Sequence, residues 1–392
     1  MINITFLPII LLPLGCIGLT SAFQVISTIV FLYLYLKNKV QFDYTQFFKS
    51  KIVKYSFCFF LLWVCGLVIS DFFIKGTATE GWHFFQRILP LILVGLFSVR
   101  NEKFFQYAWI GIVISLFIIN CDVISNFLIQ DHWRPKTMFN SPNRLGGFLI
   151  LLLPFVFAGI YALKNNFKLQ ITGSIVLILG LISLIISGSR GAMLGLIGGT
   201  FITFVLIKYK LENFKKFILS IFFTSGIILL FIISINFYFP QMISRGYDME
   251  RIYLWQSAWE MFKDYPWLGV GGGDFNKYYL NGYINPLAKE PGLVTPHNVY
   301  LWYLAERGIV TALPFILMVG FQIYIFAKNI VTKSKKVNLW ACAGLIMVLG
   351  MAIHGWVDTV MNNRTYQMMY WLLYGLTCYS IVYNKSNYGV KR

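Results

Sequence analysis

The sequence predicts an all-α, polytopic integral membrane protein with about twelve transmembrane helices and one large periplasmic loop between spans nine and ten. Hydrophobic residues make up 58% of the 392 residues, and charged residues only 12%. Apolar runs of about 17–25 residues recur from end to end, and such runs match the roughly 30 Å hydrocarbon core of a bilayer. Short Lys-rich segments separate these runs, and segments of that kind mark the cytoplasmic face.

The expected spans follow one another closely along the chain, except for a gap between the ninth and the tenth. We therefore expect a single transmembrane domain over residues 1–392, with residues 236–307 as a periplasmic insertion that carries part of an active site. The expected spans are 4–19, 21–37, 55–72, 83–99, 104–128, 144–163, 169–187, 191–207, 217–237, 308–327, 339–357 and 366–383.

The orientation follows from the distribution of basic residues. With both termini in the cytoplasm, 18 of the 23 lysines fall in short cytoplasmic segments, as the positive-inside rule requires. This signal accounts for most of the net charge of +18, so the charge requires no nucleic acid partner. The periplasmic side keeps eight of the ten arginines: Arg87, Arg134, Arg144, Arg190, Arg245, Arg251, Arg307 and Arg364.

Arginine on that side of the membrane indicates an anionic ligand, such as a diphosphate or an acidic glycan. The planar guanidinium group binds phosphate bidentately and stays charged at any accessible pH. Snorkelling at a helix end explains Arg87 and could explain Arg364. The six cysteines lie in or beside spans without a CxxC pair, which argues against a disulfide framework and a thiolate metal site.

The large loop contains two amphipathic stretches separated by a glycine-rich segment. Ile252, Trp255, Trp259 and Phe262 recur at helical spacing and predict one apolar face of a helix over 249–262. The segment 269–273 holds four glycines in five residues, but it does not complete a dinucleotide-binding pattern. It is either a structural turn or a loop that faces a glycan or phosphate through Gly271 and Gly273.

Two short turns offer further site residues. Arg190 lies in the tight outer turn 187–192, where it could bind a lipid-linked diphosphate or cap the carbonyl groups of span seven. Asn143 lies in the polar turn 138–144, most of which turn chemistry explains.

Among the four histidines, His297 is the best candidate for a general base. It follows a proline, precedes Asn298 at the start of the second amphipathic stretch, and shares the large loop with Arg245 and Arg251. A neutral imidazole can take a proton from a sugar hydroxyl. His354 lies in span eleven, four residues before Asp358, so we expect the two on one helical face, as a functional pair or as a satisfied polar contact.

Together these residues resemble the O-antigen ligase and O-antigen polymerase superfamily of bacterial envelope glycosyltransferases. The resemblance covers about half of the chain closely and its topology covers all of it. It rests on SGSRGAMLG at 187–195, RIYLWQSAWEMFKDYPWLGVGGGDF at 251–275 and PHNVYLWYLAERGIVT at 296–311.

The resemblance implies a multi-pass enzyme of the bacterial inner membrane with a periplasmic active site. It implies transfer of a glycan from undecaprenyl diphosphate to an acceptor hydroxyl, with inversion at the anomeric carbon and without a metal or other cofactor. The family's essential residues match Arg190, Arg251 and His297, and Arg245 could share the role of Arg251. Membrane lipid would surround the carrier's tail.

Three functions stay open at this point. An O-antigen ligase of lipopolysaccharide biosynthesis would transfer the glycan to lipid A-core, and the His-centred pattern favours it. An O-antigen or capsule polymerase would use a carrier-linked glycan as acceptor. A lipid-linked glycan transporter would suit the span number, but the sequence shows no inverted repeat and such a protein has little use for the large loop.

Overall fold

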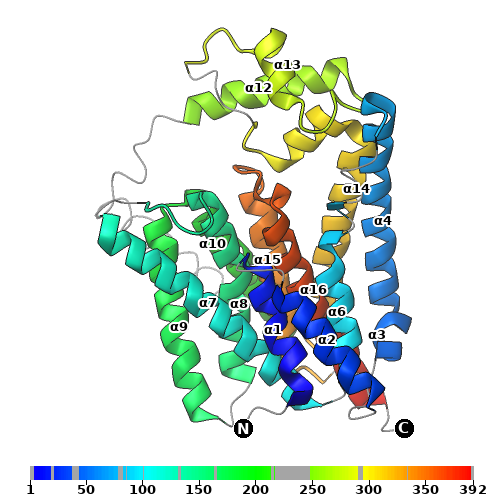
Figure 1. Ribbon diagram of the computed structural model, residues 1–392, viewed down its shortest axis with the longest axis vertical. Coiled ribbons are helices and arrows are strands. Elements are labelled where there is room, and N and C mark those ends of the chain that lie inside the picture. The colour runs from blue at the N-terminus through cyan, green and yellow to red at the C-terminus, as the bar shows by residue number, and fades with distance from the viewer. Residues whose placement is uncertain are drawn as a thin grey trace.

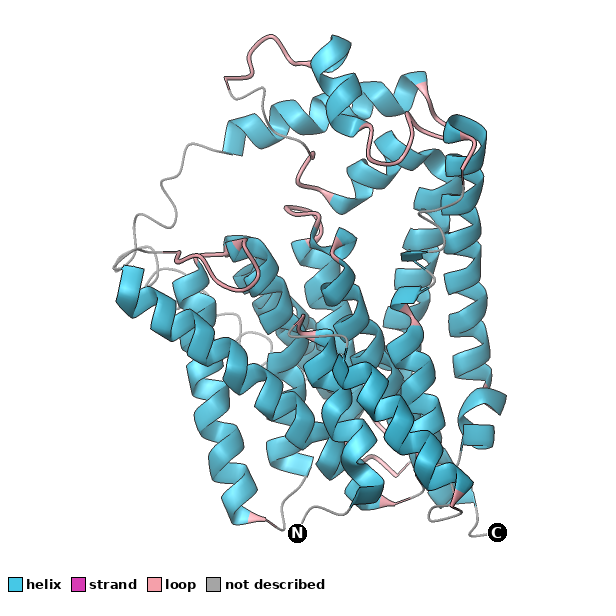
Figure 2. Ribbon diagram, viewed as in Figure 1, coloured by secondary structure: helices cyan, strands magenta, loops and turns pink. Residues whose placement is uncertain are grey.

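The fold is all-α, as predicted. The computed structural model describes residues 4–18, 22–37, 44–77, 83–84, 86–99, 101–130, 134–162, 166–212, 216, 248–289, 295–332 and 334–389. These residues form helices joined by turns, and the β-pairing among them is one isolated bridge between Val331 and Val337 (Figure 2).

The helices follow the expected spans closely. Eleven of the twelve expected spans overlap described helices, whereas span 217–237 lies outside the described residues. The longer helices are α1 (Leu7–Cys16), α2 (Ala22–Leu36), α4 (Lys51–Lys75), α6 (Leu89–Phe97), α7 (Glu102–Gln130), α8 (Pro142–Ala162), α9 (Phe167–Ser187), α10 (Arg190–Leu211), α12 (Asp248–Asp264), α14 (Val299–Asn329), α15 (Leu339–His354) and α16 (Arg364–Gly389). The short ones are η1 (Ile4–Phe6), α3 (Tyr44–Lys49), α13 (Phe275–Tyr278), η3 (Tyr279–Tyr283) and η4 (Val360–Asn362).

Length and composition identify a multi-pass membrane protein. Within the described part of the chain, α4, α7, α8, α9, α10 and α14 are each long and apolar enough to cross a membrane, and α1, α2 and α15 are shorter apolar helices. A total of twelve spans stays a prediction. Figure 1 shows the apolar helices as one bundle, with α12 and α13 lying across one end of it.

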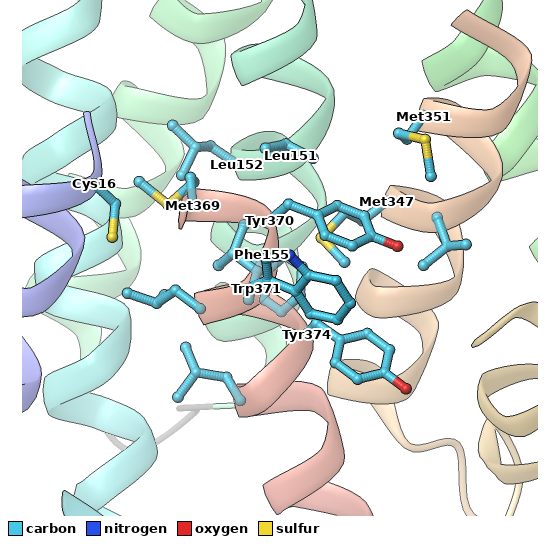
Figure 3. Packing of buried hydrophobic residues seen from close by; sticks show 14 of the residues in the cluster. Cys16, Leu151, Leu152, Phe155, Met347, Met351, Met369, Tyr370, Trp371 and Tyr374 are labelled. Carbon is cyan, nitrogen blue, oxygen red and sulfur yellow. The ribbon is translucent and has the colours of Figure 1, made fainter. Parts of the chain in front are cut away.

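Helix α8 lies at the centre of the bundle. In its most apolar stretch 78% of the residues are buried, against 33% for α9 and 22% for α10, which expose apolar side chains on the outside of the bundle. Figure 3 shows Leu151, Leu152 and Phe155 of α8 packed near Met347 of α15 and Trp371 of α16, and all five are buried. The outer helices therefore present the surface that suits lipid.

Two glycines bring α10 and α15 into direct backbone contact. A Cβ atom at Gly195 would lie 2.5 Å from the Gly350 carbonyl oxygen, and one at Gly199 would lie 2.8 Å from the Ile346 oxygen. Small residues four apart allow this close approach between membrane helices. The contact sets the first residue of α10, Arg190, beside the last residue of α15, His354.

The glycine-rich segment supports a break in α14. Gly308 has φ 63°, and a Cβ there would meet the Trp267 carbonyl oxygen at 2.2 Å. Around the break, the N–H groups of Ile309 and Val310 donate to the carbonyl groups of Pro266 and Trp267 at 2.9 and 3.3 Å. On the other side of the break, the N–H groups of Val270 and Gly271 in the glycine-rich segment donate to the carbonyl groups of Ala305 and Glu306 at 2.9 and 3.0 Å. These hydrogen bonds satisfy backbone groups that the broken helix leaves without helical partners, which favours a structural turn at 269–273.

Ion pairs join this region to α4. Arg307 and Asp71 form a buried pair, and Lys75 lies 3.2 Å from the Asp274 carboxylate. Arg307, one of the eight arginines that the sequence predicts on the periplasmic side, is thus part of the framework that holds α14 against α4.

Helix α12 forms where the periodicity predicts a helix, but its buried face differs from the predicted apolar face. Leu254, Ala258 and Met261 are buried, with exposures of 1% or less, and they pack with Phe275 of α13. Ile252 and Trp259 are 40% and 46% exposed. The glycine-rich segment and α13 cover the side of α12 that carries the smaller side chains.

Candidate active site

A polar pocket of about 230 Å³ lies where the α12 layer meets the ends of α8, α10 and α15. It gathers four of the residues that the sequence predicts for the site, from four separate segments of the chain. The lining comprises Arg134, Asn143, Gly188, Arg190, Gly191, Glu250, Arg251, His297, His354 and Val357.

The N-terminus of α10 opens into this pocket. Gly188 ends α9 in a left-handed conformation with φ 57°, so the chain reverses and α10 begins at Arg190. Ser189 precedes the helix without accepting a hydrogen bond from its first N–H groups. The first turn of a helix binds anions through these N–H groups and through the helix dipole. Arg190 therefore lies where the backbone already favours negative charge.

Two further arginines line the same pocket. Arg251 comes from the first turn of α12, and Arg134 comes from the connection between α7 and α8. The Nε–H of Arg134 donates to the carbonyl oxygen of Ser187, the last residue of α9, at 3.3 Å. Arg134 thus makes a capping contact with the end of α9, of the kind that we considered for Arg190.

Glu250 is the acidic residue that lines the pocket. It is 9% exposed, and its carboxylate accepts the N–H of Lys289 at 3.1 and 3.2 Å from its two oxygens. These contacts tie α12 to the segment that follows η3. Sequence reasoning missed Glu250 and Arg134 as site residues, although Arg134 is one of the eight arginines predicted on the periplasmic side.

His297 faces the pocket from a strained backbone. Its φ is 49°, the left-handed region that residues with a Cβ seldom adopt. Its side chain is 29% exposed, and its Nδ1 atom lies 3.9 Å from Oδ2 of Asp358. The same oxygen accepts a hydrogen bond from the Nδ2 amide of Asn143. Asp358 thus links the imidazole to the start of α8.

The carboxylate of Asp358 is held in its charged form. Burial would raise the pKa of Asp358, but the adjacent imidazoles of His297 and His354 and the N–H of Thr359 outweigh burial, so that the pKa lies below its usual value. The Thr359 N–H donates to Oδ1 at 2.7 Å. A stable carboxylate can orient a neighbouring imidazole and stabilise it once it has taken a proton.

The expectation that His354 and Asp358 share one helical face is wrong. Helix α15 ends at His354 instead of at 357, and Asp358 lies four residues further on, in the turn before η4. His354 lines the pocket itself, whereas Asp358 contacts Asn143 and approaches His297. Gly355, which follows His354, ends the helix one turn early.

The other predicted site residues lie elsewhere. Asn298 is the N-cap of α14, where its Oδ1 accepts the N–H groups of Tyr300 and Leu301 at 3.0 Å each. The N–H groups of Gly271 and Gly273 donate to the backbone and side chain of Glu306, away from this pocket. Arg245 lies outside the described residues.

The structure is that of a multi-pass membrane protein in which three arginines, a helix N-terminus and a histidine line one pocket. The family model described as O-antigen ligase matches residues 175–316, which include Arg190, Arg251 and His297. The match supports the resemblance, found in the sequence, to the O-antigen ligase and O-antigen polymerase superfamily. No curated protein gives a significant match to the chain.

Proposed function

We propose that this protein is an O-antigen ligase, which transfers a glycan from undecaprenyl diphosphate to a sugar hydroxyl of lipid A-core. The observation that carries the proposal is the convergence of Arg190, Arg251 and His297 on one pocket at the N-terminus of α10. A site with this composition can bind a diphosphate through its arginines and deprotonate a neighbouring hydroxyl group through its histidine.

The arginines would hold the departing diphosphate. In the transfer step the bond between the anomeric carbon and the diphosphate oxygen breaks, and the electron pair leaves with undecaprenyl diphosphate. Negative charge grows on that oxygen, and positioned donors are most effective where charge develops. Arg190 and Arg251 would supply the guanidinium groups, with Arg134 as a third and the first turn of α10 as a further donor.

His297 would serve the acceptor hydroxyl. Since Nδ1 faces Asp358, Nε2 is the nitrogen that would take the hydroxyl proton while the acceptor oxygen bonds to the anomeric carbon. Asp358 would fix the ring and stabilise the imidazolium that forms. Attack from the side opposite the diphosphate would invert the configuration at the anomeric carbon.

A polymerase would use the same chemistry with another acceptor, a glycan that is itself linked to the carrier. The experiment that tests the proposal and separates the two functions is transfer by the purified protein. The donor is a carrier-linked O-unit, presented with lipid A-core or without it. A product on lipid A-core identifies a ligase, and lengthened carrier-linked glycan in both reactions identifies a polymerase. Donor that stays unchanged in both refutes the enzymatic proposal.

We also propose that the pocket faces the periplasm, with both termini in the cytoplasm of an inner-membrane protein. The lysine distribution supports this orientation. Single cysteines at Asn281 in η3 and at Lys336 between α14 and α15 test it, in a background without the six native cysteines, because both positions are exposed. An impermeant thiol reagent applied to spheroplasts should label position 281 and spare position 336. The reverse pattern would overturn the orientation.

A further inference from the structure

A second polar cavity, of about 430 Å³, borders the same stretch of chain as the arginine pocket. Thr295 lines this cavity, whereas His297, two residues further on, lines the first. Two residues span at most about 7 Å, so the two cavities flank the same short stretch of chain. The turn after α15 is shared in the same way, because Val357 lines the first cavity and Asn362 lines the second.

The chemistry of the second cavity differs from that of the first. It contains one arginine, Arg87, together with the buried carboxylate of Glu306. Glu306 accepts the N–H groups of Gly273 and Phe275 at 2.9 and 3.3 Å. A single arginine provides far fewer phosphate contacts than the three arginines of the first pocket, which makes a second diphosphate site a poor fit. A neutral ligand with several hydroxyl groups suits such a mixture of donors and acceptors.

Aromatic and amide groups complete the wall. Trp302 is 5% exposed and offers an apolar surface to the cavity. The Arg87 guanidinium lies 4.2 Å from the centre of the Phe84 ring, and its Nη1 donates to the Asn362 carbonyl oxygen at 3.3 Å. These contacts fix the guanidinium at the edge of the cavity.

One buried acceptor in this wall points to a ligand. The Oδ1 atom of Asn276 is shielded from solvent and accepts no hydrogen bond from the residues that the structure describes. A buried polar atom without a partner is unfavourable, and a ligand hydroxyl that donates to it removes that penalty. Because Asn276 is half-buried and lines the cavity, its amide is the first candidate to bind a ligand hydroxyl group.

We propose that this cavity is a carbohydrate subsite that binds a sugar unit of the acceptor glycan. Asn276, Asn362 and Arg87 bind its hydroxyl groups, and Trp302 packs against its apolar face. This assignment rests on the proposed glycan transfer. It places the acceptor in a cavity beside the one that holds the donor, with Thr295 in its wall two residues from His297.

The subsite is tested by binding in the absence of any donor. The probes are deacylated lipid A-core oligosaccharide and the O-unit oligosaccharide released from its carrier, each titrated into the purified full-length protein by calorimetry. Asn276→Ala should weaken binding of one probe about tenfold, the usual effect of one lost hydrogen bond to a ligand. The matched control is Asn281→Ala, an exposed amide in the same layer that lines neither cavity.

The outcomes separate this inference from the proposed function. If the wild-type protein transfers glycan and Asn276→Ala and Asn362→Ala leave probe binding and the acceptor KM unchanged, the subsite is refuted and the transferase stands. If transfer fails but Asn276→Ala still weakens binding while Asn281→Ala does not, the carbohydrate site stands without the transfer. Weakened probe binding in Arg190→Lys, with Asn276→Ala unaffected, would move the acceptor into the arginine pocket and overturn the inference. Equal thermal midpoints for the variants exclude a folding defect.

Discussion

Replacing Arg190 with lysine separates the effect of the guanidinium geometry from the effect of the positive charge. Arg190 is the first residue of α10, half-buried, and both residues are good helix formers, so α10 should form in the variant as in the parent. Lysine keeps one positive charge but presents a point donor where arginine can bind two phosphate oxygens at once. The variant should therefore fold and bind donor, and lose rate in the chemical step.

The other arginines of the pocket limit how much transfer rate the Arg190→Lys variant loses. Arg134 and Arg251 remain in the lining and keep part of the charge stabilisation, so the loss should match one oxyanion contact and not the whole site. Removing one such contact raises the barrier by about 3 kcal/mol, which lowers the rate about 150-fold.

The assay is single-turnover glycan transfer by the purified protein, with donor binding measured in parallel. Arg364→Lys is the matched control, because Arg364 is the first residue of α16 and is exposed. It lines neither the arginine pocket nor the second cavity. Arg364→Lys should transfer at the parent rate. A rate for Arg190→Lys within threefold of the parent would mean that Arg190 does not contact the diphosphate, and the mechanism proposed above would lose its leaving-group site.

Three further variants test other parts of the structure. His297→Ala should slow transfer about 10²–10⁴-fold and leave donor binding intact, and a loss of donor binding measured by calorimetry would instead place His297 on the diphosphate. Asp358→Asn should lower the thermal midpoint at pH 7. Because the pKa of Asp358 lies below its usual value of about 3.9, the difference from the parent should persist down to about pH 5 and vanish as the pH falls through that lowered pKa; a difference that is unchanged at pH 3 would contradict this. Gly195→Val should destabilise the protein by about 1–3 kcal/mol in thermal unfolding, whereas Gly320→Val, which has open space, should not, and equal midpoints would refute the tight α10–α15 contact.

The helices could be predicted because hydrophobic length alone determines where a chain can cross a bilayer. The predicted span 308–327 begins at Gly308, the residue with positive φ that divides α14 into two portions. The end of α15 was less predictable. The apolar run continues to 357, but the helix stops at His354, where a hydrogen-bonded turn takes over.

The site residues could be predicted where charge or motif spacing singled them out. Arg190, Arg251 and His297 stand on separate segments in the sequence and line one pocket in the structure. Arg134 and Glu250 carry no local pattern that separates them from other charged residues. Their place depends on how the α7–α8 connection and α12 pack over α10, and that packing is not encoded in any short motif.

The apolar face of α12 shows why periodicity alone misleads in such a layer. The large side chains of Ile252 and Trp259 share a face, yet the close approach of α13 and the glycine-rich segment favours the face with Ala258. Periodicity identifies a helix, whereas the size of its side chains decides which neighbour can pack against it.

The left-handed backbone of His297 implies that stability and activity favour different residues at this position. The left-handed conformation destabilises a residue with a Cβ atom by about 1–2 kcal/mol, and glycine would avoid this strain. His297→Gly should therefore resist heat at least as well as His297→Ala, although both lose the imidazole. For stability alone, glycine would suit this position better than histidine.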